Sequence, residues 1–307
     1  MKKLQFTLNC IAMLAILALF CFGIVMPQYE GDYQAAMIDK AERLKSIEGE
    51  KIVLIGDSNL PFGIDSGTLE QKLGKPVVNM GMHGGTGDVF NEQAALLNVH
   101  EGDLYIVCPS RYDEEDKLTN PHLCWITIEN HFSLYPLIRA KDWPDMIAAY
   151  PTYLGKCAKL WRTGTGNSEM TNSYRRSAFN EYGDNYYPRP ASEENIDFSY
   201  VTISPISDAT VERLNSLYDK LQAKGADMVI AAYPIALCEG VPDEAQYAAF
   251  EQELRDKLKA EVISDFNSYR YDVSYFYDTH LHLTDEGVAV RTSQLAADVE
   301  KYREENQ

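Results

Sequence analysis

The segment Lys51-Ile-Val-Leu-Ile-Gly-Asp-Ser-Asn59 decides how the fold of this 307-residue chain is interpreted. Its apolar run has the length and composition of a strand that is buried on both faces. A tight Gly-Asp-Ser turn follows the run at once, and ligands of open α/β sheets bind where the strands end. The segment therefore predicts that the hydroxyl of Ser58 is presented at the carboxyl edge of a parallel sheet.

Short β-rich runs alternate with helical patterns along the rest of the chain, which is typical of parallel strands joined by crossover helices. The expected strands are residues 51–55, 76–79, 103–108, 227–233 and 262–266. Apolar residues at helical spacing mark helices over 211–221, 247–258 and 288–302. The pattern predicts an α/β fold with a parallel five-stranded sheet, in one domain covering residues 49–305.

The amino terminus departs from this pattern, because residues 4–26 contain no charged side chain. About 20 apolar residues cross a hydrocarbon core of roughly 30 Å. Lys2 and Lys3 precede the run and Glu30 and Asp32 follow it, so the bulk of the chain is expected outside the cytoplasm. We predict a transmembrane anchor over 1–27, a juxtamembrane linker over 28–48, and a single-pass protein of the cell membrane with an extracytoplasmic domain. A cleaved signal peptide is the alternative.

The alternation of strands and helices fails between about residues 111 and 200, a region that holds all three tryptophans. We interpret it as an insertion that caps the active edge of the sheet. Its aromatic side chains are expected to form a small satellite core. Stacking of these rings on sugar rings is the alternative interpretation.

Charge and cysteine usage narrow the classes of partner. The 46 acidic and 28 basic side chains give a formal charge of −18, which repels the phosphate backbone of nucleic acids. Four of the six cysteines lie outside the anchor at wide spacings, without a metal-binding pattern. We therefore expect no nucleic acid, no metal and no cofactor.

Two further segments belong with the Gly56-Asp57-Ser58 turn. Asn79-Met-Gly-Met-His-Gly-Gly85 follows the second expected strand, and Tyr277-Asp-Thr-His-Leu-His-Leu-Thr-Asp-Glu-Gly287 precedes the last expected helix. In order and spacing the three segments together resemble the SGNH (GDSL-type) hydrolase superfamily over roughly residues 49–303. The resemblance implies a three-layer α/β/α, flavodoxin-like arrangement and a serine hydrolase or acyltransferase.

The resemblance also implies roles for individual residues. Ser58 would be the nucleophile, and the backbone N–H groups of Ser58 and Gly84 would form the oxyanion hole. His282 would act as the base that Asp278 orients, with His280 as the alternative base.

The sequence departs from the family pattern in two places. The third block reads Val107-Cys-Pro-Ser-Arg-Tyr-Asp113 and lacks the usual asparagine, so a third oxyanion donor could come from Ser110, Arg111 or Tyr112. Asp278 stands four residues before His282 instead of three, a spacing similar to that of membrane-anchored cell-envelope members of the superfamily.

Two more side chains are candidates for substrate contacts, and three residues named above are candidates for metal ligands. Asn59 and His83 flank the two glycine motifs and could contact substrate. Asp278, His280 and His282 also suggest metal ligands. We disfavour a metal site because it would leave the serine motif unexplained.

These features predict a membrane-anchored extracytoplasmic serine esterase or O-acyltransferase. Its substrate would be an acyl ester of cell-envelope polysaccharide, processed through an acyl-Ser58 intermediate, and a membrane-bound O-acyltransferase could be its partner. The alternative is a catalytically weak glycan-binding or scaffold protein of an envelope O-acylation system.

Overall fold

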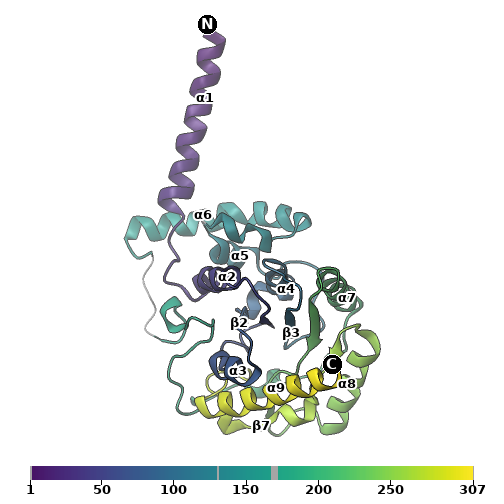
Figure 1. Ribbon diagram of the computed structural model, residues 1–307. Helices are drawn as coiled ribbons and strands as arrows, with labels where there is room; N and C mark the ends of the chain where they lie inside the picture. Colours follow the sequence, from purple (N-terminus) through teal and green to yellow (C-terminus); the bar gives the residue numbers. More distant parts are fainter. Residues whose placement is uncertain (1, 130, 167–171, 307) are drawn as a thin grey trace.

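The computed structural model describes residues 2–129, 131–166 and 172–306 (Figure 1). Met1 of the expected anchor and residues 130 and 167–171 of the expected insertion lie outside the described residues. At the amino terminus, α1 (Lys2–Leu19) continues as the π-helical segment η1 (Phe20–Val25) and projects from the rest of the molecule. This helix is long and apolar enough to cross a membrane or to serve as a signal sequence.

A parallel five-stranded sheet forms the centre of the domain, with strand order β2-β1-β3-β4-β6. Its strands are β1 (Ile52–Gly56), β2 (Val77–Asn79), β3 (Leu104–Cys108), β4 (Asp227–Ile230) and β6 (Glu261–Val262). Each lies where the sequence predicts a strand, and every residue of β1 and β3 is buried. The α/β class and the parallel sheet are therefore confirmed.

Two strands were not predicted. β5 (Ile235–Leu237) and β7 (Arg270–Asp272) pair in parallel as a separate small sheet. Each has three residues, which is too short for a recognisable periodic pattern.

Helices follow the strands as crossover connections. α3 (Ser66–Leu73) packs against β2 and α9 (Asp285–Glu305), α4 (Asp88–Gln93) against β1, α7 (Asp208–Gln222) against β4, and α8 (Glu244–Lys257) against β6. The last three helices of the chain, α7, α8 and α9, occupy the predicted positions. Each begins at a side-chain cap, provided by Ser207, Asp243 and Thr284.

Residues 28–48 differ from the expected linker. They contain the 3-10 turn η2 (Tyr33–Ala35) and helix α2 (Ala36–Ser46), on which Met37, Ala41 and Leu44 are buried in the core. These residues recur at helical spacing, so burying this face stabilises the helix against the domain. The stretch is therefore part of the folded domain.

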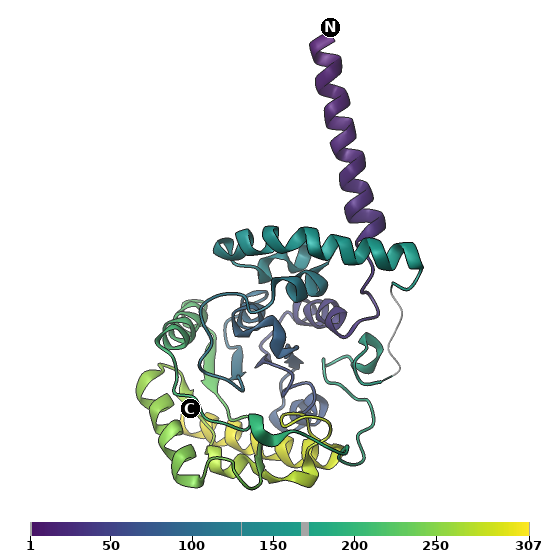
Figure 2. The same ribbon diagram turned by 180° about the vertical axis from the view of Figure 1, so that it is seen from behind.

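The insertion contains two packed helices, α5 (Pro121–Ile128) and α6 (Trp143–Thr163). The buried Trp125 ring stacks on Tyr153, and its Nε1 donates a hydrogen bond to the Met146 carbonyl at 2.7 Å. The aromatic side chains thus form a satellite core. Figure 2 shows α6 as the teal helix crossing the foot of α1, so this helix pair lies beside the amino-terminal helix. Other residues of the insertion, among them Arg111, Tyr112 and Tyr200, line a cavity at the carboxyl edge of the sheet.

We expect the substitution Lys51→Met to destabilise the domain strongly. The Lys51 Nζ lies 2.7 Å from Asp103 Oδ2, and both side chains are fully buried. Removing one partner leaves a buried carboxylate without its counter-ion, which costs about 3–5 kcal/mol of unfolding free energy. Chemical denaturation measures this loss. Lys259→Met is the matched control, since its pair with Asp219 is exposed and should contribute less than about 1 kcal/mol.

Stability should also depend on pH through Glu129, which ties the residues after the amino-terminal helix to the domain. Its carboxylate accepts hydrogen bonds from the Gln28 and Tyr29 N–H groups and the Tyr153 hydroxyl. Burial, only partly offset by these bonds, raises the pKa of Glu129 from 4.5 to about 7. Between pH 4.5 and about 7 the folded state therefore binds more protons than the unfolded state. The free energy of unfolding should fall as pH rises through this range. Melting curves should show a smaller fall for Glu129→Gln than for the wild type.

Candidate active site

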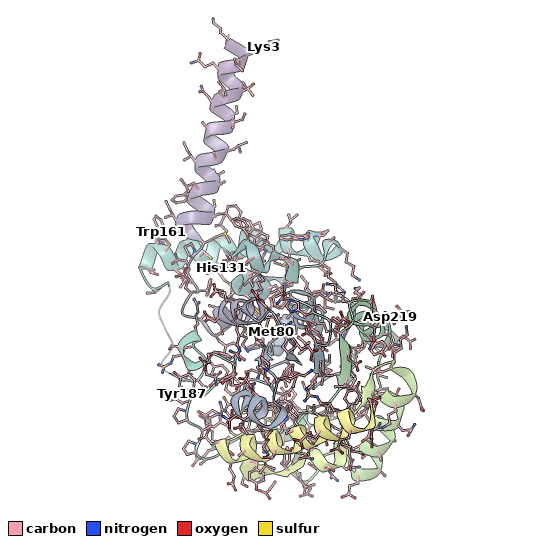
Figure 3. All side chains as sticks on the ribbon, in the orientation of Figure 1. Lys3, Met80, His131, Trp161, Tyr187 and Asp219 are labelled. Carbon is pink, nitrogen blue, oxygen red and sulfur yellow. The ribbon has the colours of Figure 1, made fainter. Side chains whose placement is uncertain are left out.

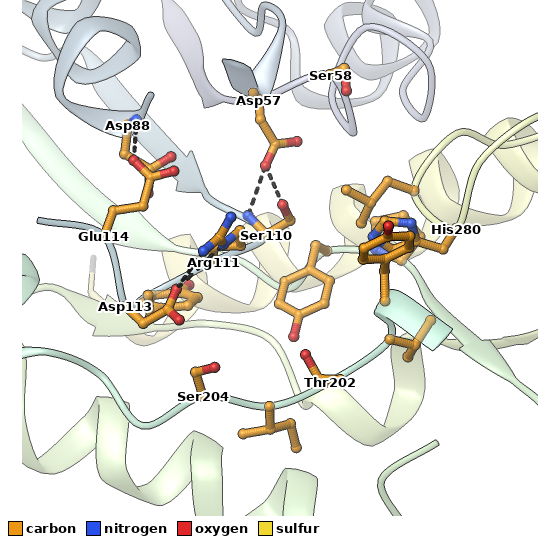
Figure 4. Close-up of a pocket in the computed structure, with 18 of the residues that line it drawn as sticks. Asp57, Ser58, Asp88, Ser110, Arg111, Asp113, Glu114, Thr202, Ser204 and His280 are labelled. Carbon is orange, nitrogen blue, oxygen red and sulfur yellow. Dashed lines mark hydrogen bonds and ion pairs between the residues drawn. The ribbon is translucent and has the colours of Figure 1, made fainter. Parts of the chain in front are cut away.

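A cavity of about 510 Å³ opens at the carboxyl edge of the sheet (Figure 4). Ser58, Gly84, Ser110 and Tyr233 all line it, and they follow β1, β2, β3 and β4 respectively. Residues that follow four neighbouring parallel strands therefore line the cavity, as expected for a ligand site in an open α/β sheet.

Ser58, His282 and Asp278 form a continuous chain of hydrogen bonds. His282 Nε2 lies 2.9 Å from Ser58 Oγ, although the two residues are 224 positions apart. His282 Nδ1 lies 2.7 Å from Asp278 Oδ1. In this geometry the imidazole can take the serine proton while the carboxylate holds the ring in place.

The loop before α9 explains how Asp278 reaches His282 across the unusual spacing. The Thr279 hydroxyl accepts the N–H groups of Leu281 and His282, at 3.3 Å and 3.1 Å. The His282 carbonyl in turn accepts the Tyr277 N–H at 2.8 Å. These bonds fold the segment into a compact turn, which brings together two side chains four residues apart.

Two neighbours of His282 were not among the predicted site residues. The Phe62 ring stacks on the imidazole, with centroids 3.9 Å apart. The Tyr174 hydroxyl donates to Asp278 Oδ2 at 2.5 Å. Burial alone would raise the pKa of Asp278, but hydrogen bonds from His282 and Tyr174 hold it below its ordinary value. No local sequence signal points to Tyr174, which lies about a hundred residues before Asp278.

Asp57 organises the turn that carries the serine. Its Oδ1 accepts the backbone N–H and the side-chain amide of Asn59, at 2.8 Å and 2.7 Å. Its Oδ2 accepts the Ser110 N–H at 3.0 Å and also the Ser110 hydroxyl (Figure 4). The carboxylate therefore ties the loop after β1 to the loop after β3.

These bonds correct two sequence predictions. Asn59 is fully buried, and its amide also donates to the Cys108 carbonyl at 2.9 Å and accepts from Arg291 at 2.7 Å, so it acts within the framework and not on substrate. Ser110 donates both its N–H and its hydroxyl to Asp57 Oδ2, so neither group serves as a third oxyanion donor in this arrangement.

The other four residues predicted to contact substrate differ in their position relative to the cavity. Arg111, Tyr112 and His280 line it, with Arg111 exposed and Tyr112 buried, whereas His83 is not among the lining residues. The His280 ring stacks on Tyr200, and within the described residues the hydrogen bond to Ser58 comes from His282. His83 is exposed, and its Nδ1 accepts the Gly85 N–H at 2.8 Å.

Ser58 and Gly84, whose backbone N–H groups are the two expected oxyanion donors, both line the cavity. Neither N–H donates to an acceptor within residues 2–129, 131–166 and 172–306. Both donors are therefore free to bind a developing oxyanion.

Lys40 holds the loop that carries Gly84. Its Nζ donates to the Gly81 carbonyl at 2.5 Å and to the Gly183 carbonyl at 2.8 Å. Burial lowers the pKa of Lys40 to about 7, although the Asp184 charge opposes this shift. Lys40 lies on α2, so the segment expected to be a linker supports the candidate site directly.

We expect Gly81→Ala to disturb this loop. A Cβ at Gly81 would lie 2.7 Å from Leu60 Cβ and 2.8 Å from both the Asp57 carbonyl and Pro61 Cδ. The overpacking should cost about 1–3 kcal/mol of stability and displace the loops that carry Ser58 and Gly84. Thermal unfolding measures the loss. In the control Gly84→Ala the new Cβ has its nearest contact at 3.5 Å, so stability should be unchanged.

Within the described part of the chain, no group of three or more His, Cys, Asp or Glu side chains is arranged to hold a metal ion. Asp278 and His282, two of the three candidate ligands, bind each other and Ser58. All six cysteines are free, and Cys108 is buried beside Asn59.

Comparisons with family models, curated proteins and solved structures returned no match to this chain.

Proposed function

We propose that this chain is a membrane-anchored extracytoplasmic serine esterase or O-acyltransferase of the SGNH type. Its substrate would be an acyl ester of cell-envelope polysaccharide. One observation carries the proposal: His282 lies within hydrogen-bonding distance of both Ser58 Oγ, at 2.9 Å, and Asp278 Oδ1, at 2.7 Å. A free hydroxyl has little nucleophilicity of its own, so a base at this distance is what it needs to react.

The arrangement of the sheet is consistent with the same family. The strand order β2-β1-β3-β4-β6 is the flavodoxin-like order, and we infer the three-layer α/β/α arrangement of the SGNH fold from it. The candidate nucleophile follows the second strand in that order, β1, and the segment with the base precedes the last helix.

In the proposed reaction, Ser58 Oγ attacks the ester carbonyl while His282 Nε2 takes the serine proton. The N–H groups of Ser58 and Gly84 stabilise the oxyanion. Collapse of this intermediate breaks the ester bond, and His282 gives the proton to the departing alcohol, which leaves an acyl group on Ser58. His282 then deprotonates water or a sugar hydroxyl, which attacks the acyl-enzyme and restores the serine.

The second candidate function is a catalytically weak glycan-binding or scaffold protein. It is favoured by the engagement of Ser110 with Asp57, which leaves the third-block loop without the amide donor typical of the family. The exposed Tyr200 ring at the cavity rim offers a surface on which a sugar ring could stack.

A fluorophosphonate probe distinguishes the two functions. Purified full-length protein in detergent should be labelled covalently, and peptide mass spectrometry should place the label on Ser58. The same protein should cleave aryl acetate esters. If transfer is the activity, the hydroxyl groups of an added oligosaccharide should become acylated. A protein that resists the probe, cleaves no ester and still binds isolated envelope polysaccharide would be the scaffold.

A further inference from the structure

Helix α6 (Trp143–Thr163) lies across the foot of the apolar helix α1 (Figure 1). The two are in direct contact, because the Trp161 ring meets Phe20 edge-on at 5.6 Å and the Tyr150 ring stacks on Phe22 at 5.7 Å. Figure 3 places Trp161 at this junction and Lys3 at the opposite end of α1. The anchor therefore determines which side of the domain, and which helix, comes nearest to a membrane.

The length of the anchor sets the depth of this junction. About 20 residues at roughly 1.5 Å per residue cross a hydrocarbon core of about 30 Å. Counted from Leu4, the first residue after Lys2 and Lys3, that span ends near Gly23. Phe20, Phe22, Tyr150 and Trp161 then lie at the level of the lipid headgroups, where aromatic side chains concentrate in membrane proteins.

The buried face of α6 is occupied by the domain. Met146, Tyr153 and Cys157 are buried, and the helix packs on α5 and η1. The opposite face, which includes Ala148, is exposed. Of the described large apolar side chains outside the anchor that are exposed, three lie here or on the neighbouring η5 turn (Phe132–Leu137): Phe132, Ile147 and Trp161, at 69%, 65% and 46% exposure.

The charge of α6 is opposite to that of the chain. The chain has a formal charge of −18, whereas α6 carries Lys156, Lys159 and Arg162 against a single carboxylate, Asp145. The three cations are exposed, and none of them joins an ion pair among the described residues. All three lie in the carboxyl-terminal half of the helix, which also carries Trp161 at the contact with α1. Cations in such a position attract anionic lipid headgroups.

We propose that the outward face of α6 lies flat on the membrane surface, with Lys156, Lys159 and Arg162 over anionic lipid headgroups. This inference rests on the proposed insertion of α1 in the membrane. It adds a second membrane contact beside the anchor, which fixes the orientation of the domain relative to the bilayer. The cavity then has a defined position relative to the bilayer.

The test uses the full-length protein in lipid nanodiscs. An environment-sensitive nitrobenzoxadiazole fluorophore is attached at Ala148→Cys on α6 or, as the matched control, at Ala249→Cys on the exposed side of α8, which lies far from the anchor in Figure 1. Cys10, Cys21 and Cys238 are replaced in both proteins, and the other three cysteines are buried. In nanodiscs containing phosphatidylglycerol, we expect the fluorophore at residue 148 to emit at shorter wavelength and to be severalfold less quenched by iodide than at residue 249.

Two comparisons test the role of the cations. The triple variant Lys156→Gln, Lys159→Gln, Arg162→Gln should lose the protection at residue 148, as should the original protein in nanodiscs of phosphatidylcholine alone. The charge-matched control Lys72→Gln, Lys220→Gln, Lys224→Gln removes three exposed cations elsewhere and should keep the protection. Equal melting temperatures of the two triple variants in detergent would show that folding is not the cause.

Equal iodide quenching at residues 148 and 249, or protection that does not depend on phosphatidylglycerol or on the three cations, would overturn the proposal. Protection seen only in native membranes would overturn it in favour of a protein partner. Washing at alkaline pH separates these results from a failure of the proposed anchor, because a protein without a membrane-spanning helix is released by the wash.

Discussion

Replacing Ser58 with alanine should lower kcat for ester cleavage by about 10⁶-fold, the loss found when the nucleophile of a comparable serine triad is removed. The reason is geometric. The Ser58 hydroxyl is the group that His282 Nε2 contacts at 2.9 Å, and no other hydroxyl in the described part of the chain occupies that position. Without Oγ no acyl-enzyme can form, and only the oxyanion donors and substrate binding remain.

The control for this substitution is Ser204→Ala, which removes a hydroxyl from the wall of the same cavity. We expect Ser204→Ala to keep kcat within about tenfold of the wild type, which corresponds to about 1.4 kcal/mol or less of activation free energy. Both variants should unfold at the wild-type temperature. Comparable ester cleavage by the wild type and Ser58→Ala would remove Ser58 from the mechanism.

The strands of the main sheet could be predicted because each is a short apolar run followed by turn residues. β1 and β3 are buried on both faces, which is why their sequences show no polar alternation. Elements without a clear local pattern were not predicted. The sequence does not predict α2, because residues 28–48 follow the expected anchor and are interpreted as a linker, although the buried face of the helix, Met37, Ala41 and Leu44, has helical spacing.

Some residues of the candidate site could likewise be predicted from the sequence and others could not. Ser58, Gly84, Asp278 and His282 belong to short motifs whose order along the chain is informative, and the structure brings them to one cavity or one hydrogen-bond chain. Tyr174 comes from the insertion, where the sequence has no periodicity from which its position could be inferred.

Two buried cations illustrate a second reason why parts of the site could not be predicted. Lys40 and Arg291 lie on buried helix faces, and their partners are mostly backbone carbonyls, together with the Asn59 amide oxygen and the Cys108 thiol. A carbonyl acceptor has no signature in the sequence, since every residue has one. Such contacts become visible only once the fold has brought distant loops together.

The second large effect is expected for Asp278→Asn, which should lower kcat by about 10⁴-fold. Asp278 Oδ2 accepts the Tyr174 hydroxyl at 2.5 Å, and Oδ1 faces His282 Nδ1 at 2.7 Å. In the asparagine variant the amide oxygen keeps the Tyr174 hydroxyl, so the NH₂ group points at Nδ1. That nitrogen must then accept, the ring proton moves to Nε2, and Nε2 can no longer take the proton of Ser58.

Tyr174 makes this tautomer argument testable. Tyr174→Phe alone should reduce kcat only modestly, since Oδ1 still orients His282. In the double variant Asp278→Asn, Tyr174→Phe the amide is free to turn its oxygen towards Nδ1, so the double variant should be more active than Asp278→Asn alone. Steady-state kinetics of the four proteins form a double-mutant cycle, in which the double variant should have a higher kcat than the sum of the two single effects predicts. A double variant slower than both single variants would show that Asp278 acts through its charge alone and not by fixing the tautomer of His282.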